Sequence, residues 1–148
     1  MSQSIALVAV AVRDYDEAKQ YYSQVLGFEI VEDVLQENGK RWIVAAPTGK
    51  GQMGLLLQKA FTDEQVSRIG NQTGGKVFLF LRTDDFDRDY DLYQSRGVRF
   101  IESPREESYG KVVKFEDVYG NRWDLLQVAE LESVSDTVKE EVILSSNI

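Results

Sequence analysis

Two tryptophans and an aspartate are the side chains of this sequence best suited to hold a small molecule. Trp42 and Trp123 fall at what look like corresponding strand edges in the two halves of the chain, and Asp124 follows Trp123 directly. Indole rings stack on flat ligands and attract cations, and a nearby carboxylate strengthens the second effect. The pattern therefore predicts a site for a flat or cationic ligand. The aromatic candidates for its walls are Trp42, Phe78, Phe80, Phe100, Tyr109, Phe115 and Trp123, each of which could instead fill the core.

Asp124 has two alternative roles, which depend on the direction of its side chain. Against an apolar wall its pKa would rise, and the carboxyl could accept a proton or anchor a cation. Facing water, it would be a surface charge. Arg122 and Arg105 could pair with Asp124 or bind an anionic ligand. The charged segment 103–110 could form a lid over a cavity or a solvated connector.

The chain contains no histidine and no cysteine. Disulfides, thiolate catalysis and cysteine metal sites are therefore excluded, and the commonest transition-metal ligand is missing. Any bound metal would need an all-oxygen shell, which suits Mg²⁺ or Ca²⁺ better than Zn²⁺ or Ni²⁺.

Composition narrows the class of protein. An apolar fraction of 43% and a charged fraction of 28% are ordinary for a globular chain of 148 residues. The net charge of −8 disfavours nucleic acid as a partner, because the phosphate backbone would be repelled. The apolar run 5–12 is too short for a signal peptide or a membrane span, so a cytoplasmic protein is expected.

Hydrophobic patterning predicts strands and helices in a repeated order. Asp14 and Glu17 have the spacing of a capping box, as do Thr62 and Gln65, and Asn38-Gly39 predicts a tight hairpin. The predicted strands are 5–12, 28–36, 40–47, 53–58, 76–82, 98–102, 111–116 and 122–128, and the predicted helices are 14–27, 62–70 and 85–97.

The second half of the chain repeats the first. Asp14-Tyr15-Asp16 matches Asp85-Phe86-Asp87, and Leu56-Leu57-Gln58 matches Leu125-Leu126-Gln127. The offsets are 85 − 14 = 71 and 125 − 56 = 69 residues, which short deletions in loops explain. The sequence thus predicts two βαβββ modules, 1–70 with its connecting helix and 71–128. An acidic tail, 129–148, could be a loose helix, an arm that holds a partner, or disordered.

The motifs, taken in order, resemble those of the vicinal oxygen chelate superfamily, which includes glyoxalase I, bleomycin-resistance and fosfomycin-resistance proteins and extradiol dioxygenases. The resemblance rests on the segment 12–18, on Tyr21-Tyr22 and Leu26-Gly27-Phe28, and on the closing segments 115–121 and 123–125, and it covers about residues 4 to 128. Asp117, Gly120 and Asn121 of the closing segment are explained by a tight turn in which Asp117 accepts hydrogen bonds from local amides.

The resemblance implies an α+β fold in which two βαβββ modules form paired curved mixed sheets around a cavity, with helices outside. It also implies a homodimer. In catalytic members a metal ion is held by one residue from the first strand and one from the last strand of each module. These positions fall here at Leu7, at Phe78 (or Val77), at Asp124 and at its repeat partner Leu55. With three apolar positions out of four, no transition metal is expected, and Asp124 is the one catalytic candidate.

Two functions of different classes follow from this resemblance. The first is a metal-free protein that binds a small molecule, for example a drug-like cation, in the cavity between the two modules without turnover, as bleomycin-resistance proteins bind their ligand. The alternative is a lyase, isomerase or dioxygenase with a reorganised site, which would need oxygen ligands such as Glu29, Glu32, Glu102 or Glu116. A scaffold that kept the fold and lost the site is a third reading.

Overall fold

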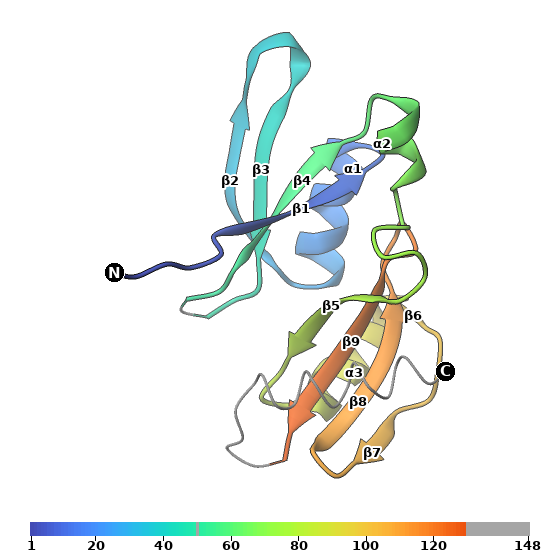
Figure 1. Cartoon of the computed structure of the whole chain (residues 1–148). Helices are drawn as coiled ribbons and strands as arrows, with labels where there is room; N and C mark the ends of the chain where they lie inside the picture. The colour runs from blue at the N-terminus through green and yellow to red at the C-terminus, as the bar shows by residue number, and fades with distance from the viewer. Residues whose placement is uncertain (50, 130–148) are drawn as a thin grey trace. The chain divides into compact units, whose positions relative to one another are not determined.

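The computed structural model describes residues 1–49 and 51–129, and the chain divides into two compact units, Met1–Gln72 (unit 1) and Thr73–Ile148 (unit 2). Each unit contains one mixed sheet and its own helix, so the predicted α+β fold of two similar modules is confirmed (Figure 1). The predicted boundary after residue 70 falls two residues before the observed one. All but the first residue of the predicted tail 129–148 lies outside the described residues.

Unit 1 contains a four-stranded sheet with the order β1-β4-β3-β2, in which β1 runs parallel to β4 and the other neighbours are antiparallel. Its elements are β1 (Leu7–Val12), α1 (Tyr15–Gln20), the π-helical turn η1 (Tyr21–Val25), β2 (Glu29–Leu35), the 3₁₀ turn η2 (Glu37–Gly39), β3 (Arg41–Ala46), β4 (Gly54–Lys59) and α2 (Asp63–Ser67).

Local signals explain where the helices of unit 1 begin and end. The Asp14 carboxylate accepts a hydrogen bond from Glu17 N at 2.8 Å and starts α1, although the Glu17 side chain pairs with Arg13 and does not complete the capping box. The box of Thr62 and Gln65 at α2 is complete. The predicted helix 14–27 changes to π geometry in its second half, and Gly27 ends it with a φ of 78°.

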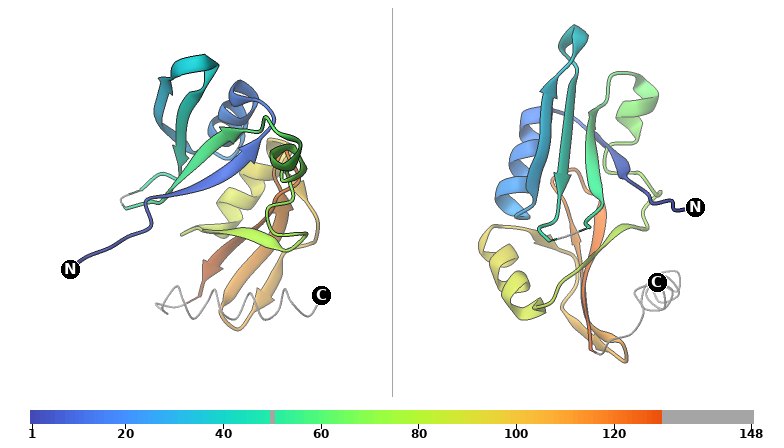
Figure 2. Two further views of the ribbon diagram at one scale, coloured as in Figure 1. Left: turned by 45° about the horizontal axis from the view of Figure 1, so that its top comes forward. Right: turned by 90° about the vertical axis from the view of Figure 1, so that its left-hand side faces the viewer.

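The core of unit 1 lies between the sheet and α1, which covers one face of that sheet (Figure 2). Strand alternation brings Val10, Val12, Ile43 and Leu57 to this face, and all four are buried. Ala18 of α1 is buried as well. A small residue at that point of the helix lets it approach the sheet closely.

Unit 2 repeats this plan with the strand order β5-β9-β8-β6, with β5 parallel to β9 and β7 paired to the opposite side of β8 from β9 in an added hairpin. Its elements are β5 (Val77–Arg82), α3 (Phe86–Ser95), β6 (Arg99–Phe100), β7 (Arg105–Glu107), β8 (Gly110–Glu116) and β9 (Arg122–Val128). The strand β7 falls in segment 103–110, which was expected to be a lid or a connector. Arg105 pairs with Val112 and Glu107 with Gly110, so the segment is a hairpin arm of the sheet.

Aromatic rings form the core between sheet 2 and α3. Phe115 stacks on Trp123 with ring centroids 5.7 Å apart and meets Tyr93 of α3 edge-on at 5.8 Å. Phe100 lies against both Phe115 and Tyr90, the latter at 4.7 Å. Contacts of this kind stabilise a core beyond the area that they bury.

The turn between β8 and β9 has the predicted structure. Asp117 Oδ1 accepts hydrogen bonds from the backbone amides of Tyr119 and Asn121, both at 3.0 Å. Its Oδ2 accepts from Asn121 Nδ2 at 3.0 Å and from Trp123 Nε1 at 3.1 Å. Asp117 is therefore a structural residue that orders the turn and holds the indole ring of Trp123. No helix in the described part of the chain is long and apolar enough to cross a membrane.

Candidate functional site

Each sheet has one face packed on its helix and one face opposite it, and Trp42, Phe80 and Asp124 of the candidate binding residues lie on these opposite faces. We call them far face 1 (opposite α1) and far face 2 (opposite α3). Because side chains alternate along a strand and paired residues share a face, the sheet registers assign each residue to one of them. In sheet 1, Ala9 and Val44 flank Leu56 on the far face. In sheet 2, Phe80 and Lys114 flank Asp124 at the matching positions.

Unit 1 contains a groove of about 330 Å³ at the end of sheet 1 where β1 and β4 finish and β3 begins, and residues from both faces of the sheet line it. This volume lies at the lower end of the range that small-molecule sites occupy. Its floor is formed by strand residues, and its rims come from the β2–β3 hairpin and from the segment that enters α2. The lining residues are Ala11, Tyr15, Gln36, Lys40, Arg41, Trp42, Leu56, Gln58, Lys59, Ala60, Phe61 and Gln65.

The two large aromatic groups of the groove differ in exposure. Trp42 is half-buried on β3, where it pairs with Val34 of β2. Phe61 lies just before α2 and 58% of it is exposed. Gln65 Oε1 accepts hydrogen bonds from the backbone amides of Phe61, at 2.9 Å, and Thr62, at 3.2 Å, and thereby holds this rim in place. The groove thus pairs a half-buried aromatic surface with an exposed one.

Arg41 at the hairpin rim is held by carboxylates from two elements. Its guanidinium donates to Asp33 Oδ2 of β2 at 2.8 Å and to Asp16 Oδ1 of α1 at 2.6 Å, and it lies 5.7 Å from the centre of the Tyr15 ring. These hydrogen bonds raise the pKa of Arg41, and those from Arg41 and then Lys19 lower the pKa of Asp33. Arg41 is therefore a structural tie between the hairpin and α1, and its charge is largely compensated.

Far face 2 carries buried charge. Asp124 is 0% exposed, and Lys114 Nζ, itself largely buried, lies 4.0 Å from Asp124 Oδ1. The same ammonium lies 4.0 Å from Glu102 Oε1, which also accepts a hydrogen bond from Lys114 N at 3.0 Å. Of the two orientations considered for Asp124, the structure thus has the buried one. The cation that the described contacts place beside it is Lys114.

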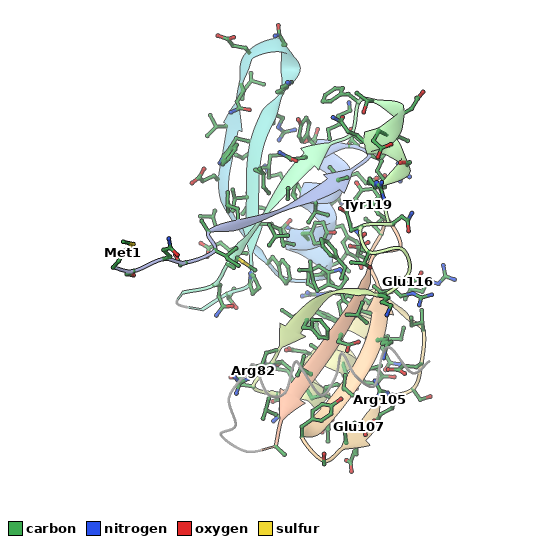
Figure 3. All side chains as sticks on the ribbon, viewed as in Figure 1. Met1, Arg82, Arg105, Glu107, Glu116 and Tyr119 are labelled. Carbon is green, nitrogen blue, oxygen red and sulfur yellow. The ribbon has the colours of Figure 1, made fainter. Side chains whose placement is uncertain are left out.

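The two arginines have other partners. Arg105 donates from Nε to both carboxylate oxygens of Glu102, each at 3.1 Å, and from Nη1 to Glu107 Oε1 at 2.7 Å. Figure 3 shows Arg105 and Glu107 side by side at the edge of sheet 2. Arg122 Nη1 donates to the backbone oxygen of Gly75 at 2.8 Å. Far face 2 therefore carries a row of alternating charges, Asp124, Lys114, Glu102, Arg105 and Glu107.

An apolar cluster lies beside this row. Tyr109, Val112 and Leu126 are buried together, with Phe80 and Val128 packed against them. Phe80, Tyr109 and Asp124 of the predicted ligand site are therefore brought together in unit 2, and Trp42 lines the groove of unit 1. Tyr109 is buried in this cluster, whereas Phe80 stays partly exposed at its margin.

The remaining predicted aromatics are placed elsewhere. Trp123 precedes Asp124 in β9 and so points to the other face, where it and Phe100 belong to the ring stack under α3. Trp42 and Trp123 consequently do not occupy corresponding positions, because Trp42 lies on a far face and Trp123 in a core. Phe78 sits at a bulge in β5, where the pairing moves from Val77–Arg122 to Leu79–Trp123.

The residues present do not fit a divalent transition metal. Leu7 lies on far face 1, where its side chain and that of Val44 fill the space above Gly54. The expected repeat partner of Asp124, Leu55, is one position out of register: it pairs with Val8 and Ala45 on the helix side, and Leu56 takes the matching far-face position. Asp124 is then a single carboxylate with an ammonium 4.0 Å away, which gives too few donors for such an ion.

Carboxylates proposed for a reorganised metal site do not converge either. Glu102 pairs with Arg105, and Glu116 lies 3.6 Å from Arg99. Glu29 and Glu32 are exposed on β2 in unit 1. Across residues 1–49 and 51–129, no group of three or more acidic side chains is placed to hold a metal ion.

Sequence reasoning missed Lys114, Gln58 and the basic residues of the groove. A lysine inside the apolar strand Val112-Val113-Lys114-Phe115 was a visible signal, because an unpaired ammonium is rarely buried. Lys40, Lys59 and Gln58 carry no such signal, because polar residues near strand ends are common. Their importance follows from the hairpin and α2 lying on either side of one groove.

Comparison with known proteins identifies the family. The model of the Glyoxalase/Bleomycin resistance protein/Dioxygenase superfamily matches residues 4–125. The chain belongs to this superfamily. Within it, an uncharacterized protein of Shewanella frigidimarina (strain NCIMB 400) is 50% identical over 135 residues, which are 90% of this chain and 100% of that protein.

Two solved structures from Streptomyces sp. CB03234 share both fold and sequence with this superfamily member. TnmS3, an antibiotic binding protein, is 31% identical with a TM-score of 0.69, over 86% of this chain and 98% of that one. A glyoxalase/bleomycin resistance protein is 34% identical with a TM-score of 0.65, over 84% of this chain and 100% of that one.

Proposed function

We propose that this protein binds a small, flat organic molecule in the groove of unit 1, without a transition metal and without turning the ligand over. The observation that carries the proposal is the groove itself, with the aromatic surfaces of Trp42 and Phe61 over an apolar floor that includes Leu56. Concave, partly aromatic sites with a few polar groups are typical of small-molecule binding. Among residues 1–49 and 51–129 no group of three acidic side chains is placed to hold a metal ion, and this supports binding over metal-dependent catalysis.

The similarity to TnmS3 supports the same proposal. That protein is an antibiotic binding protein and shares 31% of its residues with this chain. A shared fold does not fix a function, so the similarity adds to the geometry of the groove and does not replace it. The metal-dependent alternative, a lyase, isomerase or dioxygenase, has no comparable support on the described residues.

Fluorescence titration with a panel of flat aromatic compounds tests this function. The native protein should bind at least one of them with quenching of tryptophan emission, and Trp42→Ala should weaken that binding about fivefold or more because a stacking surface is lost. Trp123→Phe is the matched control: it removes an indole from the α3 core and should leave the affinity unchanged. Equal loss in both variants, or no binding to the native protein, would refute a site at Trp42.

Metal analysis separates binding from metal-dependent catalysis. Protein purified without chelators should contain no stoichiometric transition metal, and its melting temperature should not move on addition of Mn²⁺, Ni²⁺, Zn²⁺ or Fe²⁺. One equivalent of such a metal per chain would contradict the proposal and favour the enzyme.

We also propose that the protein works in the cytoplasm as a homodimer, with a small molecule and not nucleic acid as its ligand. The edge strand β2 supports the dimer, because Val34 and Leu35 on it are 53% and 74% exposed. Exposed apolar edge strands are usually covered in native proteins. Light scattering after gel filtration should give twice the chain mass of 16.9 kDa, and a monomer at micromolar concentration would contradict the proposal.

A further inference from the structure

The charged side chains that line the groove of unit 1 are basic, whereas the protein as a whole is acidic. The chain has a net charge of −8, with 25 acidic and 17 basic residues. The described lining residues that carry a charge at neutral pH are Lys40, Arg41 and Lys59, and no carboxylate is among them. A basic patch in an acidic protein concentrates anions locally and repels cations.

Two of these three positive charges are available to a ligand. The charge of Arg41 is compensated by Asp33 and Asp16, so Arg41 contributes mainly to the shape of the groove wall. Lys40 and Lys59 form no ion pair with any carboxylate of the described ranges 1–49 and 51–129. They stand on different parts of the rim, since Lys40 precedes β3 and Lys59 ends β4.

Lys59 is placed next to an aromatic surface. Its Nζ lies 5.7 Å from the centre of the Phe61 ring, within the range of a cation–π contact. The ammonium is therefore held beside an exposed ring and does not extend freely into water. An aromatic ring that carries an anionic substituent matches such a pair, because its ring packs on Phe61 while its anion meets Nζ.

Resting on the proposed binding function, we infer that the ligand of this groove is an aromatic anion, such as an arene carboxylate or a phenolate. Its ring packs against Trp42 and Phe61, and its negative group meets the ammonium groups of Lys40 and Lys59. This replaces the cationic ligand expected from the sequence, which relied on Asp124 lying beside a tryptophan site. The structure puts Asp124 in unit 2 within a row of compensating charges, and the indole beside it in the α3 core.

Three probes of one shape and different charge test the inference. Anthracene-2-carboxylate, the neutral anthracene-2-methanol and the cationic 2-(aminomethyl)anthracene are titrated separately by fluorescence and calorimetry at pH 7.5. Affinity should fall in the order anion, neutral, cation, with about tenfold between the first and the last, as expected for two partly solvated charges. Raising the salt concentration should weaken binding of the anionic probe and leave binding of the neutral probe unchanged.

A double variant assigns the preference to the two lysines. In Lys40→Gln/Lys59→Gln, the affinity for the anion should fall to that for the neutral probe, which should itself be unchanged. Lys76→Gln/Lys111→Gln is the matched control, because it alters net charge by the same amount on residues outside the groove and should preserve the preference. Equal loss in the control would show that overall charge, and not the groove, selects the ligand, and would overturn the inference.

The same experiment distinguishes failure of this inference from failure of the proposed function. If all three probes bind, Trp42→Ala weakens all of them, and the cation binds as well as the anion, the binding function stands and the anion inference is wrong. If no probe binds, or if Trp42→Ala has no effect on any of them, the groove is not the binding site and both fail.

Discussion

The matching rows of the two far faces have opposite chemistry. In sheet 1 the row is Ala9, Leu56 and Val44, which is apolar and borders a groove. In sheet 2 it is Phe80, Asp124 and Lys114, in which the two charged side chains are buried and Phe80 is half-buried. The same βαβββ plan thus carries an apolar row beside a groove on one sheet and a buried ion pair on the other. The difference shows that the backbone repeat sets where a face lies, and that a few side chains decide the chemistry of that face.

Removal of the ammonium on far face 2 should have the largest effect. Lys114→Met leaves Asp124 buried without the ammonium that lies 4.0 Å from it, and should cost about 4 kcal/mol of unfolding free energy. Urea denaturation measures it. Adding Asp124→Leu should recover most of the loss, because a packed apolar pair replaces the buried charges. Lys111→Met, which breaks an exposed pair with Asp87, should change stability by less than about 1 kcal/mol.

Gly110 should be nearly as sensitive, because it permits the close approach of β7, β8 and β9 beside Tyr109. Its φ is +144°, and a Cβ there would overlap the backbone oxygen of Gln127. Gly110→Ala should therefore destabilise by about 3 kcal/mol, from strain and overlap with backbone that cannot move away. Gly120→Ala, where φ is +92° but space is open, should cost only about 1 kcal/mol. Thermal unfolding of both variants measures the two losses. Similar losses at both glycines would contradict the packed state of far face 2.

Gly54 is the corresponding probe of far face 1 and should be more tolerant. A Cβ on Gly54 would lie 2.6 Å from Val44 Cγ1 and 3.0 Å from Leu7 Cδ2, which are side-chain atoms that can shift. Gly54→Ala is expected to cost about 1 to 2 kcal/mol. Thermal unfolding of Gly54→Ala and Gly110→Ala in parallel compares the two losses of stability. A larger loss at Gly54 would show that far face 1 is the more rigid one.

The acid response of unit 1 should be the smallest effect. The pKa of Asp33 is lowered in the folded protein from its ordinary 3.8 by its hydrogen bonds to Arg41 and Lys19. Its stabilisation is therefore fully present above pH 3.8 and is lost as the pH falls through the lower folded value. Below that pH the native protein should lose slightly more unfolding free energy than Asp33→Asn. The difference should be less than about 1 kcal/mol, because the ion pair is partly solvated. An unchanged slope in acid urea titrations would mean that the tie at Arg41 contributes nothing.

Local chemistry made several parts of the fold predictable from the sequence. Asn38 and Gly39 take φ values of 59° and 75°, as a tight hairpin requires, although the turn also contains a short 3₁₀ segment. Thr62 and Gln65 cap α2 as their spacing predicts, and Asp117 orders its turn. The strand β7 was not predictable in this way, because Arg105-Glu106-Glu107 has the composition of a solvated loop and becomes a strand only by pairing with β8.

The candidate site was less predictable, and the errors have one cause. Leu55 was paired with Asp124 by counting along the matched segments, yet Leu56 takes the matching place because the register differs by one residue. Trp123 and Asp124 are neighbours in the sequence but lie on opposite faces of β9. A shift of one residue moves a side chain to the other face of a sheet, so a small error in register inverts the assignment.

The sequence by itself determined the order of strands and helices, most helix ends and turns, the internal repeat and the family. These depend on interactions between residues close together in the chain, or on patterns that survive small changes in alignment. Only the tertiary structure decided that Asp124 meets Lys114, that Trp123 belongs to a core, and that Lys40, Lys59 and Trp42 line one groove. Pairing between distant strands sets these neighbours, and the free energy that selects a register comes from the packing of the whole sheet.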